Sequence, residues 1–430
     1  MATSRQLREQ IAAGRWDATL AALYGGSEEV LARQRSRYGA ALEQFELYYG
    51  PERQVQVYSA PGRTELGGNH TDHQHGYGLA GAVTLDLVAV ASRNEDGFIR
   101  VKSRGFNKLD VIDLTEAEPQ QGESTHSASL IRGIAEGFRA KGCDVGGFDA
   151  YTASDVLRGS GLSSSAAFEM GVAIILNTEY GCGLDAPALA RICQFAENTY
   201  FGKPSGLLDQ LTSAVGGVLF ADFADPTAPK IEKIHADGVL PEGMTLCVTD
   251  TRASHSELTG EFAAIRNEME AVASCLGGKV LGEVEEKRFW QELPRLREQC
   301  GDRAVLRAIH YFEENARTLA QRDALVAGDF AAFARLVEKS GHSSFECCQN
   351  VYCASSPKHQ GLSAALAISQ SILAGTGGAW RVQGGGFSGT IQAFVPDALV
   401  KRYCAAMEAL FGPGCCYLLS LREQGTVRVM

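Results

Sequence analysis

The residue types best suited to chemistry lie in the segment VLRGSGLSSSAAFEMGVAII, which is rich in glycine and serine. The glycines let the backbone approach a ligand closely, and the serines add hydroxyl groups that can bind phosphate oxygens or Mg²⁺. The apolar residues that follow predict a helix, whose first N–H groups and positive dipole end would point at negative charge. The predicted phosphate site comprises Gly159, Ser160, Gly161, Leu162, Ser163, Ser164, Ser165 and Ala166.

An ordinary serine-capped helix is the alternative for this segment, because serine is a favoured N-cap residue. Four serines and two glycines in one loop exceed what a single cap needs. The chain contains neither the GxxxxGK[ST] pattern of P-loop proteins nor a GxGxxG motif after a strand. The sequence therefore predicts an anion site of a less common kind.

A second polar segment, APGRTELGGNHTDHQHG, is rich in glycine and carries several side chains that hydrogen-bond well. Asn69, His70 and Asp72 together supply both donors and acceptors, which is what the hydroxyl groups of a sugar require. A zinc site formed by His70, His73 and His75 is one alternative, although the spacing matches no standard ligand pattern. A solvated polar loop is the other. We favour a loop that binds a polyol.

Two carboxylates lie where one predicted helix ends and the next begins. Glu197 is near the end of the first helix, and Asp209 follows a turn that contains Gly202 and Gly206. This turn allows both carboxylates to face one cavity. Most Asp and Glu side chains are simply solvated, but Asp209 stands among leucines, which predicts a partly buried, functional carboxylate.

These candidate residues would be positioned by a mixed set of helices and strands. Helical patterns cover 1–46, 128–140, 188–200 and most of 261–340. Strand patterns cover 55–58, 83–92, 98–103 and 147–154, with 83–92 and 98–103 predicted to pair as a hairpin. Two further strands, 217–223 and 245–249, are assigned to a second domain. We expect an α+β protein with antiparallel strand pairs and two domains, 1–220 and 221–430.

The composition excludes several functional classes. A chain of 430 residues is long for one core, and a net charge of −11 argues against a general nucleic-acid binder. The first residues lack the apolar core of a signal peptide, and no apolar run approaches the ~18 residues of a membrane span. The twelve cysteines are scattered without a CxxC pair, which favours reduced thiols. We expect a cytoplasmic protein without a membrane or nucleic-acid partner.

Several motifs, in this order, resemble those of the galactokinases in the GHMP kinase superfamily. APGRTELGGNHTDHQHG resembles the galactokinase signature GRxNLIGEHTDYNxG, and RGSGLSSSAA resembles the GxGLSSSA phosphate loop. AENTYFGKPSGLLDQ is similar to the segment that carries the catalytic aspartate, and QGGGFSGT to the motif GGGFGG. The resemblance implies a two-domain GHMP kinase fold, with an N-terminal domain like ribosomal protein S5 and a ferredoxin-like C-terminal domain.

The resemblance also implies an activity, the transfer of the γ-phosphate of ATP to the anomeric hydroxyl group of a sugar. Asp209 matches the aspartate that orients or deprotonates this hydroxyl group, and Arg63 matches the arginine beside it. Glu197 and one of Ser164 or Ser165 match the Mg²⁺ ligands, and His70, Asp72 and Gly206 match sugar contacts. The resemblance thus implies Mg²⁺ as cofactor and ATP as co-substrate, and we expect a monomer.

The sugar side of the resemblance is altered. Asn69 replaces the signature glutamate, which faces the sugar in the family, and Phe262 aligns with a tyrosine that contacts the sugar. Glu65 stands where the family has asparagine, and Ser388 interrupts the third glycine motif. Galactose is the favoured substrate. A kinase for another galacto-configured sugar such as galacturonate is the alternative, because a lost carboxylate would remove repulsion. A sensor that binds sugar and ATP without catalysis is the third hypothesis.

Overall fold

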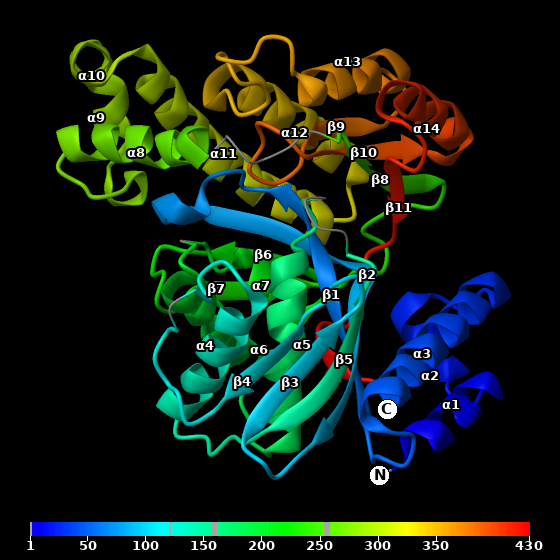
Figure 1. The fold of residues 1–430 in the computed structure, drawn as a ribbon. Coiled ribbons are helices and arrows are strands. Elements are labelled where there is room, and N and C mark those ends of the chain that lie inside the picture. Colours follow the sequence, from blue (N-terminus) through cyan, green and yellow to red (C-terminus); the bar gives the residue numbers. More distant parts are fainter. Residues whose placement is uncertain (1, 121, 157–160, 204, 253–258) are drawn as a thin grey trace.

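The computed structural model describes residues 2–120, 122–156, 161–203, 205–252 and 259–430. Two β-sheets organise the described chain, a larger one in the lower half of Figure 1 and a smaller one in the upper half. The larger sheet has the order β12-β1-β2-β5-β3-β4, and β6 pairs with both β2 and β7. Its strands are β1 (Gln56–Gly67), β2 (Tyr77–Arg93), β3 (Phe98–Ser103), β4 (Leu109–Asp113), β5 (Phe148–Ser154), β6 (Val218–Asp222), β7 (Lys230–Ile234) and β12 (Val427–Arg428).

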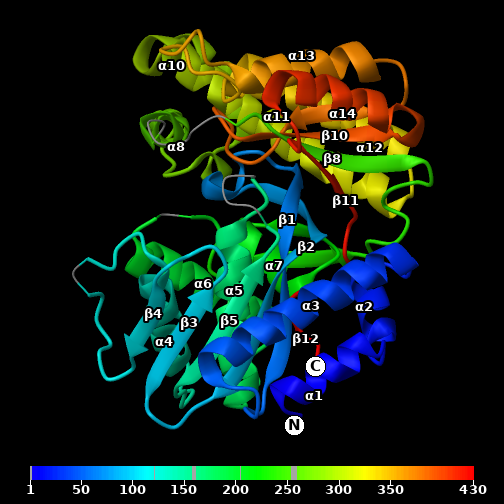
Figure 2. The ribbon, with the colours of Figure 1, turned by 45° about the vertical axis from the view of Figure 1, so that its right-hand side comes forward.

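Helices cover both faces of the larger sheet, as Figures 1 and 2 show. One face packs against α4 (Ser127–Ala140), α5 (Ser164–Glu179), α6 (Ala186–Phe195) and α7 (Leu208–Val215). The other face packs against α1 (Ser4–Ala12), α2 (Asp17–Tyr24) and α3 (Glu28–Tyr49). Strand β2 shows why both layers are needed. Leu87 and Ala89 enter the first core while Val88 and Val90 enter the second, because successive strand residues point to opposite faces.

The smaller sheet is antiparallel, with the order β11-β8-β10-β9. Its strands are β8 (Met244–Asp250), β9 (Ala379–Val382), β10 (Thr390–Pro396) and β11 (Cys416–Leu419). Helices α13 (Gly361–Leu373) and α14 (Asp397–Phe411) share an apolar core with this sheet. On α12 (Phe330–Ser343), the ring of Phe333 lies 5.5 Å from that of Phe394 on β10.

A third group of helices links the two sheets. It contains α8 (Thr259–Cys275), η3 (Leu281–Glu283), α9 (Glu286–Gln291), α10 (Leu293–Cys300) and α11 (Asp302–Val326), which share a core of their own. Helix α11 also contacts the larger sheet, where the Gln321 amide donates to the Leu66 carbonyl at 3.2 Å. No helix in the described part of the chain is long and apolar enough to cross a membrane.

The predicted α+β class with antiparallel pairs is confirmed, but two details of the strand prediction are wrong. Strand 98–103 does not pair with 83–92; it pairs with β4 and, in parallel, with β5, because β5 lies between β2 and β3. Strand 217–223 belongs to the larger sheet, since β6 pairs with Tyr77–Gly81 of β2. Sequence patterns identify strands, but their neighbours depend on tertiary packing. The division into domains at 220/221 stays a prediction.

Candidate active site

The centre of the site is a bidentate ion pair between Arg63 on β1 and Asp209 in the first turn of α7. The Arg63 Nε atom donates to Oδ1 of Asp209 at 2.6 Å, and its Nη2 atom donates to Oδ2 at 2.8 Å. Arg63 is buried, whereas about a third of the Asp209 side chain (35%) is exposed. Burial alone would raise the pKa of Asp209, but the Arg63 guanidinium holds that pKa below its usual value. Asp209 therefore presents an ionised carboxylate toward solvent.

The described part of the predicted phosphate site reaches this ion pair directly. Nη1 of Arg63 donates to the Gly161 carbonyl at 2.5 Å, and the Ser163 hydroxyl donates to Oδ2 of Asp209. Gly161 and Ser163 both have left-handed backbone conformations, with φ values of 67° and 57°, and helix α5 begins directly afterwards at Ser164. The first turn of α5 thus follows directly on a residue that contacts Asp209. Gly159 and Ser160 lie outside the described residues.

A cavity of about 530 Å³ adjoins the start of α5. The hydroxyl-bearing residues Ser164 and Ser165 line it together with the aromatic residues Phe106, Phe168 and Phe201. A helix N-terminus favours phosphate groups, and apolar walls favour a planar ring. The cavity thus has the two surfaces that a nucleotide requires.

Glu197 is held by three side chains. It lies on η2 (Ala196–Phe201), a π-helical turn that follows α6, and is almost fully buried. The Lys203 ammonium group donates to Oε1 at 2.7 Å, while Ser205 Oγ and Gln210 Nε2 donate to Oε2 at 2.6 and 2.9 Å. The carboxylate is therefore fixed in place, and one of its oxygens already faces a cation.

A second buried carboxylate, Glu169 on α5, lies beside Glu197. The Gln210 amide bridges the two, since it also donates to Oε2 of Glu169 at 3.1 Å. Burial and the nearby Glu197 raise the pKa of Glu169 well above its usual value. Burial beside another carboxylate therefore disfavours the charged form of Glu169.

Asp72 and Gly206, two of the predicted sugar contacts, lie against each other. Asp72 is on η1 (Asp72–Gln74), and a Cβ atom on Gly206 would overlap its carboxylate. Burial raises the pKa of Asp72, with a further contribution from the charge of Asp209. The Asp72 carboxylate lies directly against Gly206 and offers acceptors that suit hydroxyl groups as ligands.

Asn69 is buried, and hydrogen bonds within the protein occupy its amide group. Its Nδ2 atom donates to Oε1 of Glu65 at 2.9 Å and to the Gly384 carbonyl at 2.7 Å. Its Oδ1 atom accepts from the Asn350 amide at 2.8 Å. In the galactokinase signature, a glutamate stands at the position of Asn69 and an asparagine at the position of Glu65. The contact between Asn69 and Glu65 thus joins two positions at which this chain departs from the signature. Relative to that signature the chain has exchanged the two residue types, and their side chains are in contact here.

The other two predicted sugar residues meet at the glycine turn after β9. His70 Nε2 donates to the Gly385 carbonyl at 2.9 Å, and burial lowers the pKa of His70 to about 4. The Phe262 ring packs edge-to-face on Phe387, with centroids 5.3 Å apart. A Cβ atom on Gly385 would lie 2.7 Å from the Phe262 ring. Residue 385 must therefore be glycine for the Phe262 ring to pack against the turn.

The zinc alternative finds no support in the structure. Within the described ranges, the one three-residue group with metal-binding geometry is Cys247, Cys404 and Cys416, which contains no histidine. Burial lowers the pKa of His73 to about 3, and its ring lies 5.6 Å from that of His70 in an edge-on arrangement. These rings pack as neutral polar groups.

Sequence reasoning missed four residues around Glu197, namely Glu169, Lys203, Ser205 and Gln210. It placed Ser163 in the phosphate site but did not predict its contact with Asp209. Gln210 follows the catalytic candidate directly, and Glu169 lies one helical turn into α5, so proximity in sequence was a usable signal for both. No such signal existed for Lys203, because a lysine in a polar turn is usually solvated.

Two family models match the chain. The model "GHMP kinases N terminal domain" covers residues 129–217, which include the phosphate segment, Glu197 and Asp209. The model "Galactokinase galactose-binding signature" covers residues 43–93, which include Arg63 and Asp72. Both matches fall on the segments that converge at the site.

The chain is also similar to characterised proteins over most of its length. It is 34% identical over 379 residues to a galactokinase of Streptomyces coelicolor, which covers 87% of this chain and 92% of the relative. Its fold matches the crystal structure of Lactococcus lactis galactokinase complexed with galactose, with a TM-score of 0.77, 23% identity, and coverage of 90% and 98% of the two chains. Methanococcus jannaschii mevalonate kinase matches with a TM-score of 0.61, 15% identity, and coverage of 86% and 99%.

Proposed function

The chain belongs to the galactokinase family of the GHMP kinases, and from this premise we propose that it transfers the γ-phosphate of ATP to the 1-hydroxyl group of galactose. The observation that carries the proposal is the fork between Arg63 and Asp209, which the phosphate segment contacts through Gly161 and Ser163. A phosphoryl acceptor and a phosphoryl donor would meet at this fork.

Asp209 orients the nucleophile. Its ionised carboxylate accepts a hydrogen bond from the 1-hydroxyl group, whose oxygen then attacks the γ-phosphorus atom while the bond to the ADP oxygen breaks. Because Arg63 lowers the pKa of Asp209, the carboxylate is a weak base and would take the proton late, when the hydroxyl oxygen already bonds to phosphorus. Arg63 also donates toward charge that develops on the transferred group. Positioning supplies most of the catalysis in such a reaction.

The ATP would lie along the start of α5, with its base in the cavity beside Phe106 and Phe201 and its phosphates at Gly161–Ala166. Mg²⁺ suits the oxygen donors Ser164, Ser165 and Glu197, and the contact of Glu197 with the Lys203 ammonium group supports this assignment. When bound, the ion would neutralise charge on the triphosphate. ATP as co-substrate and a large number of cysteine thiols are both typical of a cytoplasmic enzyme.

Galactose is favoured over galacturonate by the contacts of Asn69. The galacturonate hypothesis depends on a lost carboxylate, yet Glu65 supplies a carboxylate 2.9 Å from the Asn69 amide. The carboxylate thus stands at residue 65 instead of residue 69, and Nη2 of Arg381 lies 2.6 Å from its Oε1 atom. A uronate would still approach a carboxylate. Asp72, Gly206 and the neutral His70 are left as sugar contacts.

The proposal is tested by ADP release from MgATP with galactose, galacturonate, N-acetylgalactosamine, arabinose and glucose, and with Asp209→Ala as the control. Turnover on galactose that is lost in the variant supports the proposal. Turnover on galacturonate alone would overturn the choice of sugar. Calorimetry with galactose and a non-hydrolysable ATP analogue tests the sensor hypothesis, which predicts that both ligands bind without ADP release.

A further inference from the structure

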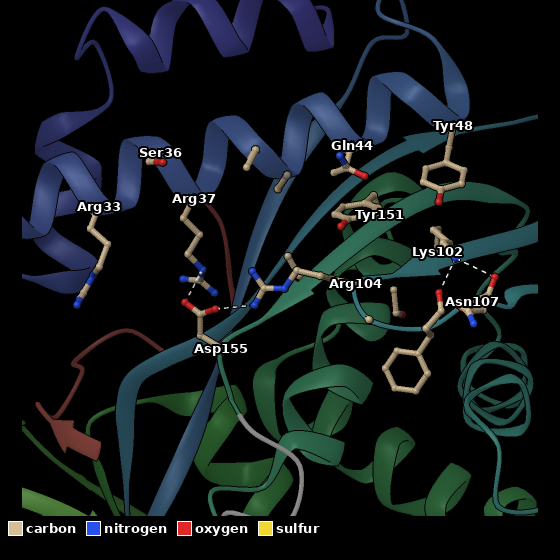
Figure 3. A pocket seen from close by; sticks show the side chains of 16 residues that line it. Arg33, Ser36, Arg37, Gln44, Tyr48, Lys102, Arg104, Asn107, Tyr151 and Asp155 are labelled. Carbon is tan, nitrogen blue, oxygen red and sulfur yellow. Dashed lines mark hydrogen bonds and ion pairs between the residues drawn. The ribbon is translucent and has the colours of Figure 1, made fainter. Parts of the chain in front are cut away.

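A larger cavity, of about 830 Å³, lies on the opposite face of the main sheet from α4–α7. Figure 3 shows it between the side chains of α3 and those of β3, β5 and the turn 104–107 that follows β3. None of the residues proposed for catalysis lines it. Its volume is within the range of small-molecule sites, ~300–1,000 Å³.

The lining of this cavity, which we name the α3 pocket, is basic. It contains four cationic side chains, Arg33, Arg37, Lys102 and Arg104, and one carboxylate, Asp155. The carboxylate is shared, since Arg37 Nε lies 2.9 Å and Arg104 Nη2 2.7 Å from its two oxygens. Arg37 also donates to the buried Asp86 at 2.5 Å, so the excess positive charge of the lining comes mainly from Arg33, Lys102 and Arg104. In a chain with a net charge of −11, such a concentration of positive charge draws small anions.

The arrangement of these groups favours a phosphate ester. Guanidinium groups bind phosphate through paired N–H donors, and Ser36 and Gln44 on α3 add further polar groups to the lining. At the other end, the rings of Tyr48 and Tyr151 stack 6.3 Å apart, and Lys102 Nζ lies 5.5 Å from the Tyr48 centroid. One end thus suits a phosphate group and the other a ring.

The α3 pocket and the nucleotide cavity share a wall. Ser103, Arg104, Phe106 and Asn107 line both. Lys102 holds this wall from the side of the α3 pocket, because its ammonium group donates to the carbonyls of Phe106 and Asn107 at 2.5 and 3.0 Å. A ligand that binds Lys102 or Arg104 would therefore shift the shared wall, and with it the lining of the cavity beside Ser164 and Ser165.

We propose that the α3 pocket binds a small phosphate ester, a sugar phosphate or a nucleoside monophosphate, and that this binding is coupled to ATP binding through residues 103–107. The coupling rests on the proposed function, because it needs ATP in the smaller cavity, whereas the binding does not. Coupling between two sites is reciprocal, so each ligand changes the affinity of the other by the same factor.

The test is calorimetric titration of the full-length protein with galactose 1-phosphate, with UMP and with pyrophosphate. Galactose and a non-hydrolysable ATP analogue first saturate the catalytic site, so that only a second site can respond. The three probes separate the contributions of the sugar, the base and the phosphate. We expect one molecule of at least one probe to bind per chain.

Two variants locate that binding. Arg33→Ala removes an exposed cation and should weaken binding about tenfold, as expected for one charged contact. Ser36→Glu places a carboxylate in the pocket and should abolish binding. Arg15→Ala, an exposed arginine outside the pocket, is the matched control and should change nothing. In the wild type, but not in Ser36→Glu, the probe that binds should shift the KM for ATP at least twofold.

Absence of binding by all three probes, or equal binding in all variants, would overturn the proposed site. Binding that Ser36→Glu abolishes, without any effect on the KM for ATP, would keep the site and overturn the coupling. ADP release with galactose is measured on the same preparations. A protein that binds a probe but phosphorylates no sugar would therefore refute the proposed function and leave the pocket standing.

Discussion

The two sides of the active site are built differently, although both begin on β1. The phosphoryl-transfer side joins Arg63, Ser163, Glu197 and Asp209, which all belong to the larger sheet and its helices. The sugar side joins residues 65–72 to α11, η4 (Ser344–Cys348) and its following residues, and the turn after β9, which are far away in the chain.

This difference assigns the two sides different physical roles. The first side is a local cluster, in which one fork fixes the charge of one carboxylate. The second is an interface, in which Glu65, Asn69 and His310 connect the signature segment with the C-terminal half through buried polar contacts. Changes on the first side should affect the chemical step, and changes on the second side should affect sugar binding and stability.

The largest effect is expected for Asp209→Asn. The variant loses the charge that orients the sugar hydroxyl group, and its amide group would face the donors of Arg63. We expect kcat to fall about 10³-fold, within the range for such groups, while galactose still binds. Steady-state ADP release and calorimetry with galactose provide the two measurements.

Arg63→Lys and Asp225→Asn are the controls for this prediction. The lysine keeps a positive charge without the fork, so its loss in kcat should be smaller, about 10². Asp225 is an exposed carboxylate away from the site, and its variant should match the wild type. If Asp209→Asn raised only the KM for galactose, the first side would be a binding surface, and the contrast between the two sides would fail.

Arg381→Met should cause the largest loss of stability. The buried guanidinium donates to Glu65 at 2.6 Å and lies 4.0 Å from Oε1 of Glu314. Its removal leaves the buried Glu314 and the largely buried Glu65 with fewer partners, which costs about 3–5 kcal/mol of unfolding free energy. Urea denaturation checks this value. The double variant Arg381→Met, Glu65→Gln should recover part of the loss, and a loss of kcat above about tenfold would contradict the assignment of roles.

The two sides also differ in what the sequence could predict. The motifs located Arg63 and Asp209 because each is fixed by a short local pattern, and the structure joins them in a fork. Short local patterns could not predict the interface on the sugar side. The partner of Glu65 is 316 residues away, and the pairing of Asn69 with Glu65 depends on how β1 bends into the following loop. Likewise, the α+β class was readable from hydrophobic patterns, whereas the place of β5 between β2 and β3 was not.

The exchanged pair at positions 65 and 69 offers a direct test of the interface. Glu65→Asn removes the nearer carboxylate partner of Arg381, and Asn69→Glu places two carboxylates within contact distance. Each single variant should therefore raise the KM for galactose about tenfold or more. The double variant restores the arrangement of the galactokinase signature and should recover most of that loss. Additive effects of the two substitutions would show that the pair is not coupled.

Phe262→Tyr should produce a small gain. The ring lies against Gly385, beside the contact of His70, and tyrosine stands at the aligned position in the family. A hydroxyl group that reaches the sugar would lower the KM for galactose about two- to tenfold, the value of one neutral hydrogen bond. Phe387→Tyr, the partner ring in the edge-to-face pair, is the control. An unchanged KM would place Phe262 outside the sugar site.

The smallest effect concerns acid stability, and it separates the two sides by pH. His310 is fully buried and donates from Nε2 to the Asn69 carbonyl at 2.9 Å, and burial lowers its pKa below 6.5. Below pH 6.5 the unfolded chain therefore binds a proton that the folded protein does not, so stability falls as the pH decreases, by at most about 1.4 kcal/mol per pH unit. Asp209 contributes to stability in a lower pH range. Because the pKa of Asp209 is lowered in the folded protein, this contribution is lost only when the pH falls below the usual pKa of a carboxylate.

The variant His310→Gln can keep the hydrogen bond to Asn69 but cannot take up the proton. Its unfolding free energy, measured in urea between pH 7 and pH 5, should fall less steeply than that of the wild type. The exposed His359→Gln variant serves as the control and should keep the wild-type slope. Equal slopes for His310→Gln and the wild type would mean that His310 does not contribute to the acid sensitivity, and that other groups, such as His70 with its lowered pKa, cause it.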